Sequence, residues 1–78
     1  MSESVTFEIR RRLGVLAENP KSHWTKEANI VSWNNGPEKL DIREWSPEHD
    51  KMSKGVTMNE EEAKLLQGML NNLFGGVK

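Results

Sequence analysis

The sequence contains no cysteine, which excludes a disulfide framework and any metal site built on thiolates. Its longest apolar runs are far too short to cross a bilayer, and no basic-then-apolar leader opens the chain. We therefore expect a soluble protein of the cytoplasm, with no membrane partner.

The chain is also short, and its 78 residues make a single domain, residues 1–78. A chain of this size buries only about 60–65% of the surface that its unfolded form exposes, which leaves its stability marginal. With no disulfide or thiolate metal site available, self-association is the expected supplement.

Positive charge is not in excess either, since the formal net charge is −1. This is an objection to nucleic-acid binding, because phosphate neutralisation usually requires a basic domain. However, cations recur along the first two-thirds of the chain, whereas Glu60, Glu61 and Glu62 gather near its end. A basic face and an acidic end could coexist, so composition alone does not decide the function.

The chain carries no recognisable catalytic set. It has no serine–histidine–acid arrangement, no phosphate-cradling glycine loop and no cofactor fingerprint. His49 lies between Glu48 and Asp50, but adjacent residues rarely converge on one ion. We expect no catalysis, no cofactor and no metal site.

Three segments show the alternation of half-buried strands. Residues 5–15 are apolar at most odd positions, with a bend expected near Gly14. Residues 24–33 and 39–45 follow, and the Asn-Asn-Gly-Pro sequence at 34–37 predicts an antiparallel hairpin between them. Residues 54–58 form a candidate short fourth strand.

One helix follows, with Asn59 as its N-cap, Glu62 completing a capping box and glycine at 75–76 as its stop. The predicted fold class is α+β, a four-stranded antiparallel meander followed by one C-terminal α-helix. Apolar residues form a stripe on the helix that is wider than a single sheet covers, which favours a homodimer. The expected interface residues are Leu66, Met69, Leu70 and Leu73.

Strand alternation places Trp33 and Trp45 outward among several cations. Aromatic rings stack on unpaired bases while cations follow the phosphates, so such a surface suits single strands with little sequence preference. The alternative is that both tryptophans pack in a second buried face or a dimer seam. Arg10, Arg11 and Arg12 form the densest basic cluster, either a phosphate-binding edge or an ordinary solvated strand face.

Several motifs in order resemble the positive cofactor four (transcriptional coactivator p15) family. They are Asp-Ile-Arg-Glu-Trp at 41–45 and Lys-Gly-Val-Thr-Met-Asn at 54–59, followed by the helix. A small bacterial branch is especially similar in Trp-Thr-Lys-Glu at 24–27, Val-Ser-Trp-Asn at 31–34 and Trp-Ser-Pro at 45–47.

The resemblance implies a curved antiparallel sheet whose copies dimerise through their helices and bind single-stranded DNA. It implies nucleic-acid contacts from Arg43, Trp45 and Lys54, with Lys26 and Trp33 aligned more loosely. Our mechanistic hypothesis has Trp33 and Trp45 stacking on bases while four cations neutralise phosphates: Lys26, Lys39, Arg43 and Lys54.

Other interpretations of the ligand and of the function remain open. RNA is an alternative ligand, and transcription, replication and repair are all compatible settings. The second candidate is a protein-interaction module that docks a partner such as an RNA polymerase subunit, and an enzyme is a distant third.

Overall fold

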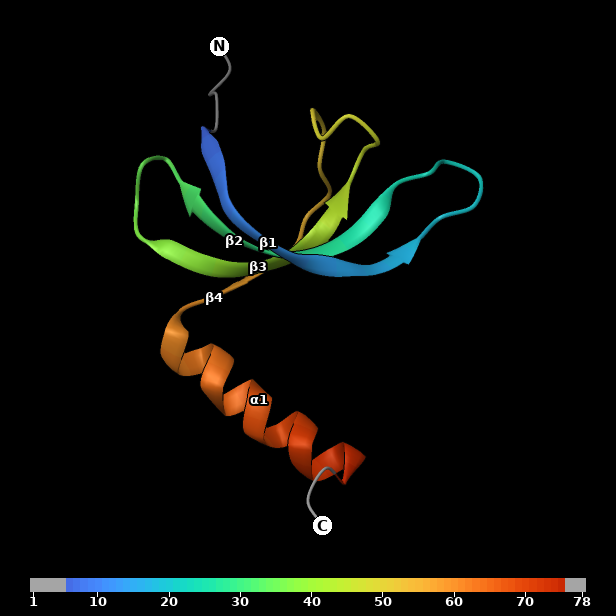
Figure 1. Ribbon diagram of the computed structural model, residues 1–78. Coiled ribbons are helices and arrows are strands. Elements are labelled where there is room, and N and C mark those ends of the chain that lie inside the picture. Colours follow the sequence, from blue (N-terminus) through green and yellow to red (C-terminus); the bar gives the residue numbers. More distant parts are fainter. Residues whose placement is uncertain (1–5, 76–78) are drawn as a thin grey trace.

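The computed structural model describes residues 6–75. Four strands and one helix follow one another along the chain (Figure 1): β1 (Phe7–Glu18), β2 (Thr25–Trp33), β3 (Glu38–Trp45), β4 (Val56–Met58) and α1 (Glu60–Phe74). The strands form one antiparallel sheet in the order β1-β2-β3-β4. The predicted meander with one C-terminal helix is confirmed. Within residues 6–75, no helix has the length and apolar character needed to cross a membrane.

The β2–β3 hairpin turns where the Asn-Asn-Gly sequence predicted. Asn34 and Asn35 both have positive φ, at 51° and 62°, and the Gly36 amide donates to the Trp33 carbonyl at 2.8 Å. Positive φ at both central residues gives the type I′ geometry, whose twist matches that of paired strands. The register that follows pairs Ser32 with Glu38.

β1 differs from the prediction because it is longer and less regular. It runs to Glu18, and its register with β2 shifts three times, first between Ile9 and Arg11. Each bulge adds one residue to β1 and increases the local twist. Side-chain alternation counted from the sequence therefore fails along this strand, although the expected bend near Gly14 falls at the second bulge.

α1 begins and ends as its sequence predicted. The Asn59 side chain accepts from the Glu62 amide, and the Glu62 carboxylate accepts from the Asn59 amide, which completes the capping box. Gly75 adopts the left-handed conformation at the C-cap with φ of 64°, and its amide donates to the Asn71 carbonyl.

The curved sheet has two different faces. Figure 1 shows the ends of the strands bending away from α1, so that the helix lies against one face and the loops rise on the other. We call the face away from α1 the concave face. The strand pairing places on it, among others, Phe7, Ile9, Arg12, Glu27, Asn29, Val31, Trp33, Lys39, Asp41, Arg43 and Trp45. The helix face carries Ala28, Ile30, Leu40 and Ile42, which border a groove with α1.

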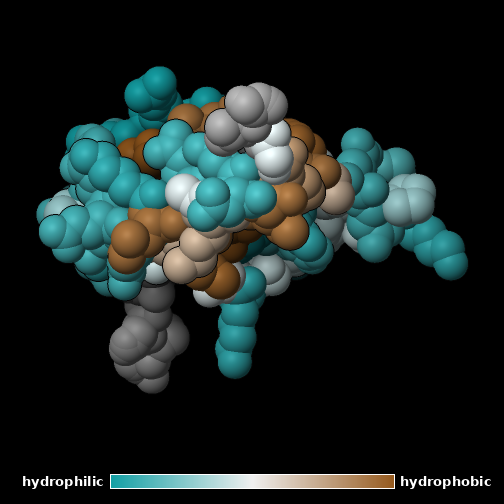
Figure 2. All heavy atoms as spheres, turned by 90° about the horizontal axis from the view of Figure 1, so that it is seen from below, coloured by the Kyte–Doolittle hydropathy of each residue, from teal (hydrophilic) through white to brown (hydrophobic). Residues whose placement is uncertain are grey.

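A single chain builds only a small core. Among the described residues, Val31 and Trp45 are the buried hydrophobic residues, and α1 contains no buried residue. A groove of about 550 Å³ with a mainly apolar lining remains between α1 and the helix face. Seen from the side of α1, Figure 2 shows hydrophobic side chains forming a band between hydrophilic ones. One copy of the chain therefore leaves an extensive apolar surface uncovered.

Candidate nucleic-acid interface

Arg43 is fixed at the centre of the concave face by a buried carboxylate. Its Nε and Nη2 atoms donate to the two carboxylate oxygens of Asp41, both at 2.7 Å. Its Nη1 atom donates to the Ser53 carbonyl at 3.3 Å. Thr57 of β4 donates to the same Asp41 at 3.3 Å. All three guanidinium nitrogens of Arg43 thus have partners inside the protein, which fix the orientation of the group.

Trp33 is half-buried beside this pair. The guanidinium carbon of Arg43 lies 4.5 Å from the centre of the indole ring, in a cation–π arrangement, and Phe7 packs on the same ring at 5.7 Å. The indole Nε1 of Trp33 is buried without a hydrogen-bond acceptor. Arg43 and Phe7 therefore hold the ring in one orientation, and part of it stays open to solvent.

The prediction that Trp45 points outward is wrong, because its side chain is 0% exposed. Strand alternation does place it on the concave face, but residues 46–53 fold back over that face. Phe7 contacts the ring at 5.2 Å between centroids, and His49 stacks on it at 5.5 Å with an interplanar angle of 25°. In the chain without a ligand, Trp45 is therefore buried, as the alternative prediction had it, and neither face of its ring is open to a base.

Glu27 anchors this cover from the neighbouring strand. It accepts hydrogen bonds from Thr25 at 2.6 Å and Asn29 at 3.1 Å, and it pairs with the His49 imidazole at 2.9 Å. Burial acts to raise the pKa of Glu27, but these hydrogen bonds together outweigh it, so the pKa lies below its usual value. The concave face thus contains an ionised glutamate with three internal partners.

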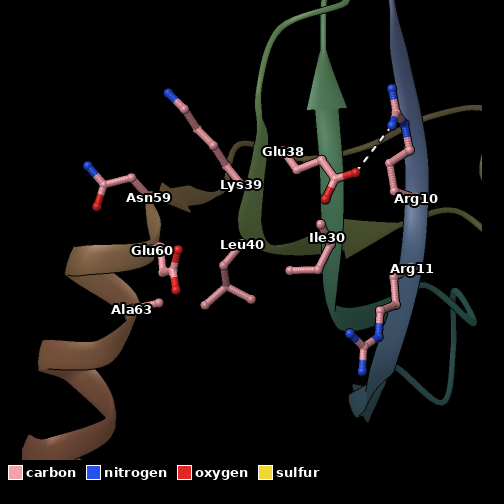
Figure 3. Close-up of a pocket in the computed structure, with 9 residues that line it drawn as sticks. All are labelled: Arg10, Arg11, Ile30, Glu38, Lys39, Leu40, Asn59, Glu60 and Ala63. Carbon is pink, nitrogen blue, oxygen red and sulfur yellow. Dashed lines mark hydrogen bonds and ion pairs between the residues drawn. The ribbon is translucent and has the colours of Figure 1, made fainter.

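The cations divide between the two faces. Lys39 is exposed and pairs with Val31 on the concave face, and Figure 3 shows its amino group directed away from the Leu40 side chain, although Lys39 also borders the cavity drawn there. Lys26 pairs with Glu44 and shares the helix face with Ala28, so the prediction that it joins Trp33 in one surface is wrong. Lys54 is exposed in the segment that precedes β4.

The first bulge of β1 also redistributes the arginine cluster. Arg10 pairs with Glu8 at 3.1 Å and with Glu38 at 3.2 Å. Arg10 and Arg11 both line a cavity on the helix side of the sheet (Figure 3). Arg12 pairs with Asn29 and is exposed on the concave face. Regular strand alternation would put Arg10 and Arg12 on one face, and the extra residue in the bulge explains why they differ.

Two groups that organise this face, Asp41 and His49, are not evident from the sequence pattern. Asp41 alternates with apolar residues in a way that suggests solvent exposure, and only the Asp-x-Arg spacing, which puts both side chains on one face, signals the pair. His49 lies in a polar loop, and its contact with Trp45 depends on how that loop folds. Among the described residues, no three histidine, aspartate or glutamate side chains are placed to hold a metal ion.

Comparison with known proteins shows the family of this chain. The family described as Transcriptional Coactivator p15 (PC4) matches residues 21–69, a range that includes β2, β3, β4 and most of α1. An uncharacterized protein of Treponema pallidum (strain Nichols) is 38% identical over 73 residues, which cover 94% of this chain and 85% of that protein.

Proposed function

The chain belongs to the Transcriptional Coactivator p15 (PC4) family, a non-enzymatic family of nucleic-acid-binding domains, and from this premise we propose that its concave face binds single-stranded DNA. We propose transcription as the setting, because the family is described as a transcriptional coactivator. The ligand is bound with little base preference, since phosphates and ring faces are common to every nucleotide.

The charge distribution on the concave face carries this proposal. The carboxylates of β2 and β3 on this face, Glu27 and Asp41, are both held by internal hydrogen-bond donors. Arg12 and Lys39 remain exposed at its surface. The face therefore presents these cations to solvent while Glu27 and Asp41 are buried against internal donors, although the whole chain has a net charge of −1. The first turn of α1 holds three glutamates, and α1 lies on the other face of the sheet.

The residues have different roles in the proposed complex. Lys39, Arg12 and Lys54 contact phosphates, and the open part of the Trp33 ring contacts a base. Arg43 is a positioning residue, because its donors already hold Asp41 and its guanidinium lies over Trp33. The proposed phosphate contacts are therefore fewer than the sequence suggested, and Lys26, on the helix face, is not among them.

A pair of lysine variants tests the proposal. We would titrate a fluorescent oligo-dT strand and a matching duplex with the wild type, K39A and K26A over a range of salt concentrations. The wild type is expected to prefer the single strand and to lose affinity as salt rises. K39A should flatten the dependence of log K on log salt by about 0.7, the contribution of one phosphate contact on a single strand. K26A is the matched control, because it removes the same charge from the helix face.

Two results would contradict the proposal. If the wild type does not bind oligo-dT even at low salt, the nucleic-acid function is wrong, and the protein-interaction module becomes the better reading. If K39A and K26A flatten the salt dependence equally, the contact surface is not the concave face.

We also propose that the protein is a homodimer formed through α1. Leu66 and Leu70 line the groove between α1 and the sheet, and Met69, Leu70 and Leu73 are 63%, 42% and 71% exposed. A second copy would cover this apolar band, and each copy would present one concave face to the nucleic acid. Light scattering combined with size-exclusion chromatography measures the mass directly. A mass of one chain at high concentration would refute the dimer.

A further inference from the structure

The segment 46–53 folds into a small structure of its own above the concave face. The Ser46 amide donates to the Lys51 carbonyl at 3.0 Å, and the His49 amide donates to the Ser46 carbonyl at 2.9 Å. The Ser46 hydroxyl donates to Asp50 at 2.8 Å and accepts from the Lys51 amide at 3.0 Å. The turn is thus closed by bonds that do not depend on its contact with the sheet.

One side chain holds the tip of this turn to the sheet. Among the described residues, the side-chain hydrogen bond that joins residues 47–51 to the sheet is that of His49 to Glu27. The same imidazole covers the ring of Trp45 in a nearly parallel stack. Loss of this contact would free the Trp45 face that His49 covers, while the turn kept its internal hydrogen bonds and Ser53 stayed paired with Glu44.

The closed position carries one cost. The indole Nε1 of Trp45 is buried without an acceptor, and a buried donor without a partner destabilises the state that contains it. His49 has a φ of 61°, in the left-handed region that a residue with a side chain seldom adopts, but this conformation belongs to the turn itself. The unsatisfied indole N–H is therefore the feature that opposes the closed form.

We propose that residues 47–51 form a displaceable strap, in which His49 occupies the place on Trp45 that an unpaired nucleobase takes when a single strand binds. The strap inference rests on the proposed function, because it needs a single strand as the ligand. An imidazole and a nucleobase are both flat, nitrogen-containing rings, so the exchange replaces one stack by another of the same kind.

Strap closure lowers the apparent affinity for single strands. Only the open fraction of the protein offers Trp45 to a base, and the apparent dissociation constant is the intrinsic one divided by that fraction. Removal of the His49 ring should raise the open fraction and therefore tighten binding. The direction of the change in affinity distinguishes the two roles, because removal of a side chain that itself contacts the ligand would weaken binding.

The chain offers a matched control for this test. His23 also has a positive φ, 65°, and also pairs with a glutamate, Glu18 at 3.1 Å, but it stacks on no tryptophan. We would compare the wild type, H49G and H23G for binding of a labelled oligo-dT strand. Glycine keeps the positive φ free of strain and removes the same ring in both variants. H49G is expected to bind about threefold or more tightly than the wild type, and H23G should not differ from it.

The outcomes separate the two proposals. If the wild type binds but H49G binds equally or more weakly, the strap inference is wrong and the proposed function stands. If the wild type does not bind at all, the proposed function itself fails.

A second measurement on the wild type covers the case in which H49G does not fold. The ring protons of His49, shifted in the NMR spectrum by the Trp45 ring, should move toward the position of a free imidazole as oligo-dT is added. Those of His23 should stay in place. If the His49 signals stay shifted at saturating oligo-dT, the strap remains closed in the complex and the inference is overturned.

Discussion

Both carboxylate oxygens of the fully buried Asp41 accept hydrogen bonds from the guanidinium of Arg43, at 2.7 Å each. The two residues are neighbours on one face of β3, so their spacing of two in the sequence produces the contact directly. The pair also draws in the rest of the face, because Thr57 donates to Asp41 and Trp33 lies under the guanidinium. It therefore joins β2, β3 and β4.

Loss of the Arg43 side of this pair should destabilise the fold strongly. R43M leaves the Asp41 carboxylate buried without its charge partner, and breaking a buried ion pair in this way costs about 3–5 kcal/mol. Urea unfolding at a fixed protein concentration measures the change. R12M is the matched control, since Arg12 is exposed on the same face, and it should change the free energy of unfolding by less than about 0.5 kcal/mol. Equal effects of the two substitutions would contradict the role of the pair.

Gly55 should tolerate no side chain. A Cβ at this position would lie 2.5 Å from the Ile42 carbonyl oxygen and closer still to the Cβ of Arg43. G55A is therefore expected to cost about 1–3 kcal/mol of unfolding free energy, as overpacked sites do.

At a second glycine, Gly68, we expect alanine to increase the stability of the protein. Gly68 lies within α1, and a Cβ there meets nothing within 4 Å. G68A should stabilise the protein by up to about 1 kcal/mol, because alanine is the better helix former. Thermal unfolding of both variants compares the two signs, and a stabilising G55A would show that β4 does not approach Arg43 so closely.

The sequence predicted the fold well because local signals agree with one another. The turn at Asn34 and Asn35, the capping box at Asn59 and the alternation in β2 and β3 each depend on a few neighbouring residues. The prediction failed where one extra residue or one loop changes the geometry. The bulge after Ile9 separates Arg10 from Arg12, and the 46–53 segment buries Trp45. Neither event has a sequence signal as strong as a turn or a cap.

Part of the stability should depend on pH through Glu27. Its pKa in the folded protein is lowered from an ordinary value of 4.5, so the ionised form stabilises the fold. This contribution is fully present above the pKa of the unfolded chain and is lost as the pH falls through the lower folded value. The free energy of unfolding should therefore decrease in acid.

A variant isolates this contribution. E27Q cannot ionise, so its stability should fall less steeply in acid than that of the wild type, although Asp50, whose pKa is lowered mainly by the Ser46 hydroxyl, adds a dependence of the same sign to both. E44Q is the control, because Glu44 is exposed on the helix face. Urea unfolding between about pH 3 and pH 7 gives the slopes, and parallel curves for E27Q and the wild type would refute the assignment.

The proposed dimer predicts a difference between two neighbouring positions of α1. Leu73 is 71% exposed and continues the apolar band, whereas Asn72 is an exposed polar residue that points about 100° away around the helix. L73E places a charge where the second copy would cover the band, and burial of an unpaired carboxylate opposes association. L73E should therefore shift the mass measured by light scattering from two chains to one, while N72E, which adds the same charge, should leave it at two. If both variants keep the mass of two chains, the copies associate through another surface, and the apolar band of α1 requires a different explanation.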